Sequence, residues 1–166
     1  WLNDKKYYHN QGDTTYEGEN SIYGDFSGLD DIDTNSPEVV TGMTEIFKNV
    51  ISEFKPDGFR IDTVKHVNIE FWADFAPALV DHAKAIGIPE FFMFGEVYSG
   101  DVKELSAYTT IGKMQSVLDF PLLNSKEHIN LLRCSRVMLT IMTVTVMPIS
   151  CLTLPVTMTW DVFQAC

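Results

Sequence analysis

The chain has 166 residues, which permits one domain, and it carries 23 Asp and Glu residues against 12 Lys and Arg. This acidic balance argues against a nucleic-acid partner and suits a neutral polyhydroxyl compound or a bound cation. No signal peptide is recognisable, and the sequence starts at Trp1 in a loop-like stretch, so we expect a fragment of a longer protein. The three cysteines lie in the last third without metal-type spacing and predict neither a disulfide framework nor a zinc site: Cys134, Cys151 and Cys166.

Residues 1–35 are rich in Asn, Asp, Gly and Tyr and show no sustained helical or strand period. A loop of this length in a compact fold is usually functional or disordered. A solvated acidic loop explains most of its aspartates, but their carboxylates are also hard oxygen ligands of the kind that Ca²⁺ binds. They are Asp13, Asp25, Asp30, Asp31 and Asp33.

Two amphipathic helices are predicted next. Ser36 as N-cap, Pro37 and an acid in the first turn mark the start of one. Asn68 can cap the other, which runs to about Ile86 and is ended by Gly87. Apolar residues recur at helical spacing, so each helix buries one face: Val39, Val40, Met43, Ile46, Phe47, Val50 and Ile51 in the first, and Phe71, Trp72, Phe75, Leu79 and Val80 in the second.

Between these helices, residues 57–66 predict a short strand that ends in a cluster of charges. Arg60 and Asp62 are two positions apart, so they point to the same side, where pairing keeps the carboxylate ionised. Lys65 and His66 follow where the strand gives way to a loop. Ionisable groups that converge on the carboxyl end of a strand indicate an active site in an α/β fold. Phe59 and Ile61 are the apolar residues of this strand, and Gly58 allows close packing at its start.

A second strand is predicted in the apolar run 91–97, which we expect to be buried and parallel to the first, with Glu96 near its end. Asp101 starts a short helix, and residues 114–120 predict a third strand. The alternation of helices and strands indicates a parallel sheet in an α/β protein. Asp62 and Glu96 would then end neighbouring strands, and two carboxylates in different environments are what glycoside hydrolysis needs.

These residues resemble a known family. Gly58–His66 is similar to the second signature region of the α-amylase family (glycoside hydrolase family 13), and Phe94–Val97 is similar to the third. Gly28–Asp33 resembles the short motif after the third barrel strand, and the three motifs occur in the family's order. The resemblance covers roughly residues 7–123 and implies an incomplete (β/α)₈ TIM barrel, from the loop after strand 3 through strand 6.

The resemblance also implies a reaction, the retaining hydrolysis of α-1,4-glucosidic bonds in starch-like α-glucans. Asp62 would be the nucleophile and Glu96 the general acid and base. Arg60 would hold Asp62 ionised and oriented, while Lys65 and His66 would bind sugar hydroxyls on the leaving-group side. Retention predicts that the two carboxyl groups lie about 5 Å apart.

By the same resemblance, Asp31 would ligate Ca²⁺ with its carboxylate, and His66 would contribute its backbone carbonyl. The family has Pro or another residue where this chain has Asp30. The expected partner is an α-glucan oligo- or polysaccharide, with no nucleic acid and no membrane. Location is left open, although family members that act on polymeric starch are usually exported.

Residues 1–35 are thus expected to form the acidic loop, and residues 36–123 the central barrel units, but the character changes after about Asn124. No charge occurs from Val137 to Trp160. A membrane span would fit such a stretch poorly, because it contains many Thr residues and two prolines. An aggregation-prone β segment is a second possibility.

A third possibility is that residues 124–166 are translated out of frame. When each codon is formed from the last base of one codon and the first two of the next, Met158 with Thr159 forces Asp, and Trp160 with Asp161 forces Gly. The surrounding junctions permit Gly-Asn-His-Asp-Met-Gly-Arg, which resembles the fourth signature region with its third catalytic carboxylate. We hypothesise a frameshift between about Asn124 and Arg136, which makes the present tail non-native.

Two signature features are absent from the sequence as written, the first region and this third carboxylate. We therefore expect the isolated chain to be inactive. An α-1,6-debranching or glucosyl-transfer enzyme of the same family, and a non-catalytic amylase-like binding module, remain alternatives. The combination of Asp62, Glu96 and Arg60 argues against the binding module, which has no need of all three.

Overall fold

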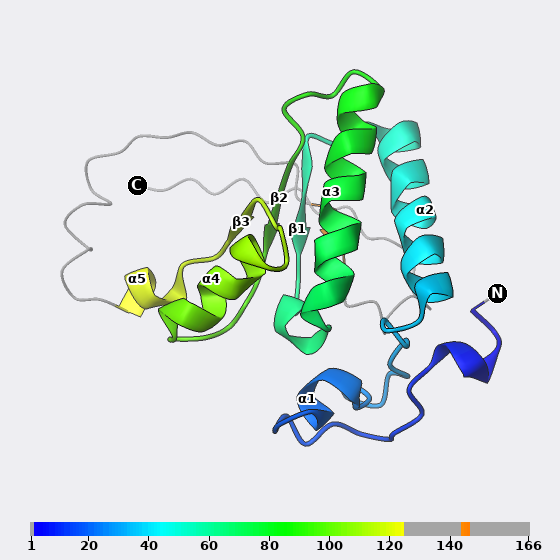
Figure 1. Cartoon of the computed structure of the whole chain (residues 1–166), viewed down its shortest axis with the longest axis vertical. Coiled ribbons are helices and arrows are strands. Elements are labelled where there is room, and N and C mark those ends of the chain that lie inside the picture. The colour runs from blue at the N-terminus through cyan, green and yellow to red at the C-terminus, as the bar shows by residue number, and fades with distance from the viewer. Residues whose placement is uncertain (1, 125–143, 147–166) are drawn as a thin grey trace.

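In the computed structural model, which describes residues 2–124 and 144–146, helices pack against a small parallel sheet (Figure 1). The described elements follow one another as the 3₁₀ turn η1 (Lys5–Tyr7), α1 (Asn20–Tyr23), α2 (Pro37–Phe54), β1 (Gly58–Ile61), the 3₁₀ turn η2 (Val64–His66), α3 (Ile69–Ala85), β2 (Phe92–Gly95), α4 (Val102–Thr110), β3 (Ser116–Val117), α5 (Phe120–Asn124) and β4 (Val144–Val146). Helix, strand, helix, strand, helix, strand is the order predicted from the sequence for residues 36–123.

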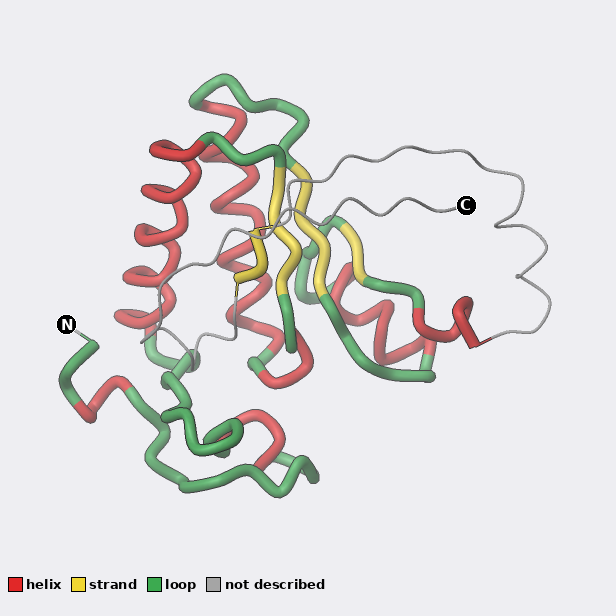
Figure 2. The backbone as a smooth tube through the Cα atoms, turned by 180° about the vertical axis from the view of Figure 1, so that it is seen from behind, coloured by secondary structure: helices red, strands yellow, loops and turns green. Residues whose placement is uncertain are grey.

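The sheet has the strand order β3-β2-β1-β4, and every described pairing is parallel. Parallel neighbours need a crossover, which α3 supplies between β1 and β2 and α4 supplies between β2 and β3. Seen from behind, the strands lie in front of α2 and α3 (Figure 2). No described helix covers the opposite face of the sheet.

The absence of a side chain at Gly58 allows β1 to approach β2 closely at this position. A Cβ atom at this position would lie 2.0 Å from the carbonyl oxygen of Phe92, which no side chain can tolerate. The predicted close packing at the start of the first strand is therefore confirmed.

The two long helices begin and end close to their predicted limits. α2 starts at Pro37, and α3 ends one residue before Ile86, with Gly87 at a φ of 89°. Neither predicted N-cap side chain bonds to its helix. The Asn68 side chain instead accepts a hydrogen bond from the Thr34 hydroxyl, because both side chains are buried together where the N-terminal segment meets α3.

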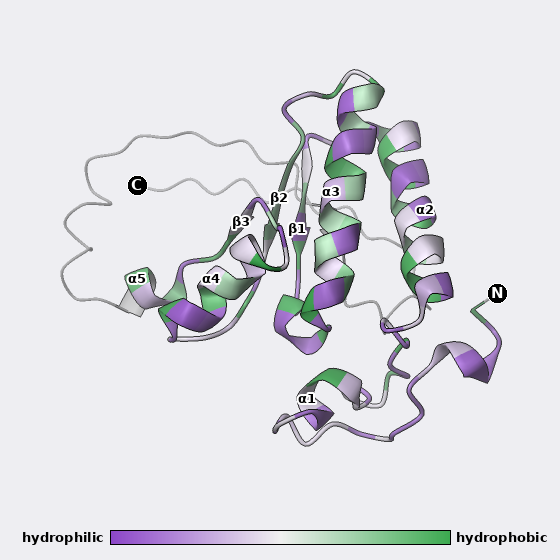
Figure 3. Ribbon diagram, in the orientation of Figure 1, coloured by the Kyte–Doolittle hydropathy of each residue, from purple (hydrophilic) through white to green (hydrophobic). Residues whose placement is uncertain are grey.

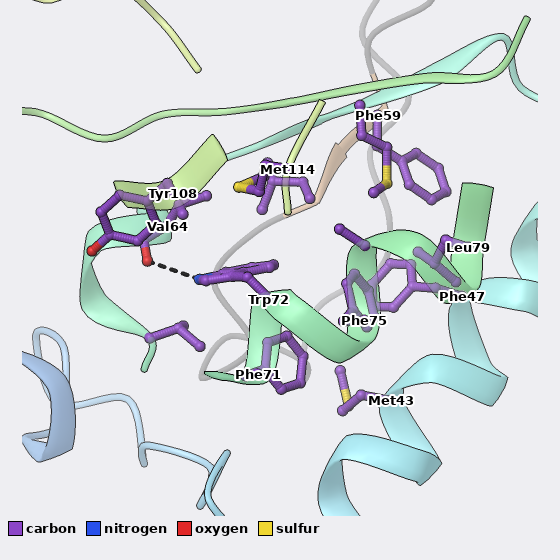
Figure 4. Close-up of a cluster of buried hydrophobic side chains, with 14 of the residues drawn as sticks. Met43, Phe47, Phe59, Val64, Phe71, Trp72, Phe75, Leu79, Tyr108 and Met114 are labelled. Carbon is purple, nitrogen blue, oxygen red and sulfur yellow. Dashed lines mark hydrogen bonds between the residues drawn. The ribbon is translucent and has the colours of Figure 1, made fainter. Parts of the chain in front are cut away.

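The core lies between these helices and the sheet (Figure 4). Both helices show hydrophilic and hydrophobic bands around their axes, as amphipathic helices do (Figure 3). Phe47 packs edge-on against Phe59 of β1 and Phe75 of α3, so one ring joins all three elements. The largest fully buried side chains are Phe59, Phe71, Phe91, Met43, Ile51, Leu79, Met93, Val39, Val64 and Val97.

Two predicted strands differ from the structure. The second strand is buried on one face only, because Phe92 is 40% exposed on the face that no described helix covers. The third strand spans only Ser116–Val117, since α5 begins at Phe120 and ends the extended stretch.

The segment before α2 is more ordered than the composition predicted. It contains η1 and α1. In Figure 1 it lies beyond the end of β1 that leads into η2 and α3. None of the described helices is long and apolar enough to cross a membrane. The expectations for residues 125–143 and 147–166, including the frameshifted tail and the membrane span, lie outside the described residues.

Candidate active site

Asp62 and Glu96 follow directly after two paired strands. Ile61 at the end of β1 is in register with Gly95 at the end of β2, so the next residues are neighbours across the sheet. The backbone of Glu96 bonds to both sides of Asp62, because its N–H donates to the Ile61 carbonyl at 2.7 Å and its carbonyl accepts from Val64 N–H at 3.0 Å. The sheet thus places the two carboxylates side by side, as the sequence predicted.

Arg60 lies close to both of these carboxyl groups. One nitrogen of its guanidinium group, Nη2, is 3.4 Å from Asp62 Oδ1 and 3.6 Å from Glu96 Oε2. All three side chains are partly exposed, at 25–33% of their surface, so solvent and ligands can reach them. A single cation therefore faces both carboxylates where β1 and β2 end.

The surroundings of Glu96 raise its affinity for a proton. A hydrogen bond with Asp62, burial and the negative charge of Asp62 raise the pKa of Glu96, while a backbone hydrogen bond from Thr63 and the Arg60 charge oppose the shift. Glu96 therefore keeps its proton to higher pH than an ordinary glutamate does. A carboxyl group with a raised pKa is what a general acid requires.

Thr63 holds a strained backbone next to Asp62. Its φ is 51°, in the left-handed region that β-branched residues avoid. Its hydroxyl oxygen is buried and has no hydrogen-bond partner among the described residues. Strain of this kind persists only where surrounding contacts enforce it, and it is concentrated at functional sites.

Lys65 and His66 lie in the 3₁₀ turn η2, whose carbonyl at Val64 accepts a hydrogen bond from the Trp72 indole at 3.1 Å (Figure 4). His66 Nδ1 donates to the Ser21 carbonyl at 2.8 Å, which ties this turn to the N-terminal segment. In the neutral ring this bond leaves Nε2 as an acceptor. Both predicted sugar-binding residues are thus fixed close to the strand end that carries Asp62.

The rings of Tyr16 and Phe26 contact the His66 imidazole edge to face. Their ring centroids lie 6.1 and 5.2 Å from that of His66. The N-terminal segment therefore builds one wall around this residue.

Asp31 has a different surrounding from the one expected of a metal ligand. Its Oδ2 bonds to His9 Nδ1 at 2.5 Å, and His9 Nε2 lies 3.0 Å from Asp33 Oδ1. Burial raises the pKa of Asp31 against the effect of the His9 bond. Burial lowers the pKa of His9, but the bond and charge of Asp31 and the charge of Asp33 outweigh it, so that pKa is raised.

The predicted calcium ligands are fewer than the ion needs. Within residues 2–124, no group of three or more His, Cys, Asp or Glu side chains could hold a metal ion. Ca²⁺ takes six to eight oxygen ligands, and the predicted set supplies only the Asp31 carboxylate and the His66 carbonyl. The acidic, His and Cys side chains of the described residues therefore do not by themselves form a calcium site.

Comparison with known proteins decides the family. A family model described as the α-amylase catalytic domain matches residues 4–153. The chain belongs to the α-amylase family. An α-amylase of Streptomyces lividans is 54% identical over 121 residues, which are 73% of this chain and 13% of that protein. α-Amylase 2 of Schizosaccharomyces pombe is 32% identical over 128 residues, which are 73% of this chain and 20% of that protein.

Solved structures agree with the family assignment. An Anoxybacillus α-amylase matches with a TM-score of 0.61 and 35% identity, over 74% of this chain and 27% of that one. The α-amylase of Geobacillus thermoleovorans, solved in complex with acarbose, matches with a TM-score of 0.61 and 33% identity over the same shares. The predicted fold class, an incomplete TIM barrel, is thus confirmed, and the chain spans only a small part of each relative.

In this α-amylase-family chain, Glu104 and His9 form ion pairs with predicted site residues, although the sequence did not single them out. Glu104 pairs with Lys65 at 3.3 Å, and His9 links Asp31 to Asp33. An acid in the first turn of a helix is expected for the helix dipole alone, so Glu104 gave no separate signal. His9 lies 22 positions from Asp31 in a stretch without periodicity, and only the fold brings them together.

Proposed function

We propose that the protein containing this chain is a retaining α-glucan hydrolase that cleaves α-1,4-glucosidic bonds in starch-like polysaccharides. One observation carries the proposal: Arg60 faces both Asp62 and Glu96, and the pKa of Glu96 is raised. This arrangement supports a nucleophile beside a proton donor. The α-amylase relatives, one of them in complex with acarbose, support the substrate class.

In the first step a carboxylate oxygen of Asp62 attacks the anomeric carbon as the bond to the leaving oxygen breaks. Glu96 gives its proton to that oxygen, so the leaving sugar departs as an alcohol. In the second step Glu96 takes a proton from a water molecule, which attacks the anomeric carbon and releases Asp62 as a carboxylate. Both displacements invert the carbon, so the product keeps the substrate's configuration.

The neighbouring residues bind rather than react in this proposal. Arg60 keeps both carboxyl groups oriented, and Lys65 Nζ donates to sugar hydroxyls on the leaving-group side. His66 adds a donor or an acceptor at Nε2. These roles are consistent with the partial exposure of all three side chains.

Calcium binding would also need ligands from outside the described residues. Asp31 and the His66 carbonyl would be two of its ligands, and the others would have to come from elsewhere in the longer protein. No step of the reaction passes through the ion. A fall in the melting temperature of the longer protein when EDTA is added, reversed by excess calcium, is the expected result.

The test is the release of reducing sugar from soluble starch by the longer protein. We expect Asp62→Asn to lower the rate by at least about 10⁴-fold, as loss of a nucleophile does, without a change in melting temperature beyond a few degrees. Proton NMR of the first product should show the α-anomer. A β-anomer first product, or full activity in Asp62→Asn, would refute the retaining mechanism. The 166-residue chain alone should release no sugar.

We also propose that the coding sequence for residues 124–166 contains a shifted frame. Its nucleotide sequence is the direct test. A single inserted or deleted base that restores Asn-His-Asp downstream would supply the third carboxylate of the parent enzyme. If the bases for Val156 and Thr157 cannot encode Asn-His in the shifted frame, the tail belongs to the protein as written.

A further inference from the structure

Glu104 joins the two segments that follow β1 and β2. Its Oε1 lies 3.3 Å from Lys65 Nζ, in the turn after β1. Its Oε2 accepts a hydrogen bond of 2.5 Å from the hydroxyl of Ser99, in the segment after β2. Each oxygen of the Glu104 carboxylate thus contacts a different loop at the carboxyl end of the sheet.

The position of Glu104 is itself fixed by the start of α4. The N-cap Asp101 accepts a hydrogen bond from the Lys103 N–H at 2.8 Å, and its own N–H donates to the Ser99 hydroxyl at 3.1 Å. Ser99 therefore accepts from the helix start and donates to Glu104. This chain of bonds connects the first turn of α4 to Lys65.

The Lys65–Glu104 pair does little for stability. Each side chain is 36% exposed, and ion pairs with this exposure contribute about 0–1 kcal/mol. The pair does restrict Lys65, whose flexible stem otherwise samples many rotamers. An ammonium group has three donors, so one bond to Glu104 leaves others for a ligand.

We propose that Glu104 is a positioning residue that holds Lys65 Nζ in place to donate to a sugar hydroxyl. This inference rests on the proposed function, since it gives Lys65 an α-glucan as its ligand. Glu104 touches no reacting atom and acts through Lys65. The entropy of fixing Lys65 is lost on folding rather than on binding, which favours affinity for the sugar.

The experiment compares Glu104→Gln with Glu45→Gln in the longer protein, with maltoheptaose as the probe. Glu45 pairs with Lys48 at 2.9 Å on the exposed side of α2, so its variant removes a similar ion pair elsewhere. Fixing one side chain is worth about 0.5–1.5 kcal/mol, so Glu104→Gln should raise the Kd and KM for maltoheptaose by about three- to tenfold. We expect kcat to stay within about twofold, and Glu45→Gln to change neither constant.

A double-mutant cycle shows whether Glu104 acts through Lys65. Lys65→Met should weaken maltoheptaose binding at least as much as Glu104→Gln, and adding Glu104→Gln to it should have no further effect. An unchanged Kd in Glu104→Gln, or a full additional loss in the double variant, would overturn the inference. So would a matching loss in Glu45→Gln.

Hydrolysis and binding are measured separately, so a failure of the proposed function can be distinguished from a failure of the inference about Glu104. A longer protein that binds maltoheptaose but releases no sugar overturns the proposed hydrolase, while the Kd comparison still decides the role of Glu104. If the longer protein hydrolyses starch and its KM is the same in wild type and Glu104→Gln, the proposed hydrolase stands and the inference about Glu104 is overturned. A protein that neither binds nor hydrolyses the glucan overturns both.

Discussion

The sheet formed by β1 and β2 has two different faces, although successive side chains of each strand point to one face and then to the other. On the face covered by α2 and α3, Phe59 is 1% exposed and Met93 is 0% exposed. On the other face, Phe92 is 40% exposed, and Arg60 points the same way as the two carboxylates. Because successive side chains of a strand alternate, one face can be packed for stability while the other presents chemistry.

The difference explains why charges gather beyond the strand ends and not within the core. Beneath the helices the strands bury only apolar side chains, so an ion there would lack water and a partner. Asp62 and Glu96 lie one residue past the paired strands, where Arg60 reaches both of them. The packed face should therefore decide stability, and the charged face should decide activity.

After Asp62→Asn, Glu96→Gln should have the largest effect on activity. Loss of a general acid and base lowers kcat by about 10²–10⁴-fold, and Gln keeps the shape of the side chain. Starch hydrolysis by the longer protein measures it. Glu90→Gln, in the turn before β2, is the control, and it should keep the wild-type rate.

The pH profile sharpens this prediction. Because the pKa of Glu96 is raised, the folded protein keeps this proton at a pH where the unfolded chain has lost it. Its contribution to stability is therefore present at low pH and is lost as pH rises from the usual Glu value through the raised pKa. Glu96→Gln should flatten that part of the stability curve, and an unaltered curve would contradict the raised pKa.

Phe59→Ala should have the next largest effect, and on stability. Removing a buried ring of this size costs about 3–5 kcal/mol, whereas Phe92→Ala should cost clearly less, because Phe92 is already 40% exposed in this chain. Urea unfolding of the 166-residue chain measures both. Equal losses would mean that the two faces are packed alike. In the longer protein, a larger cost for Phe92→Ala would show that other barrel elements cover it.

Local patterns were enough to predict the two long helices and the first two strands. Helical spacing of apolar residues placed α2 and α3, and Gly58 and Gly87 marked a close contact and a helix end. The two-residue spacing of Arg60 and Asp62 predicted their pairing. These features depend on neighbours along the chain, which a single sequence contains.

Contacts between distant segments could not be predicted in this way. The short third strand depends on where α5 begins, and the exposure of Phe92 depends on which elements cover the sheet. The partners of Asn68 and Asp31 come from segments 34 and 22 residues away, and both are side-chain contacts without a periodic signal. Tertiary contacts override local preference in such places.

Thr63→Gly should have the smallest effect and should move stability and activity in opposite directions. A non-glycine residue at a φ of 51° costs about 1–3 kcal/mol, and glycine removes that strain together with the unpaired hydroxyl. Glycine also gives the unfolded chain more conformational freedom, which lowers the free energy of unfolding by about 0.4–1 kcal/mol. We therefore expect a net gain of about 1 kcal/mol in the free energy of unfolding.

Activity should fall at the same time, because the backbone beside Asp62 loses its restraint. Thr63→Ala is the matched control, since it removes the hydroxyl and keeps a side chain at positive φ. If Thr63→Ala gains as much stability as Thr63→Gly, the buried hydroxyl accounts for the strain. If Thr63→Gly gains stability with full activity, the left-handed turn is a cost of the fold and contributes nothing to holding Asp62 beside Glu96.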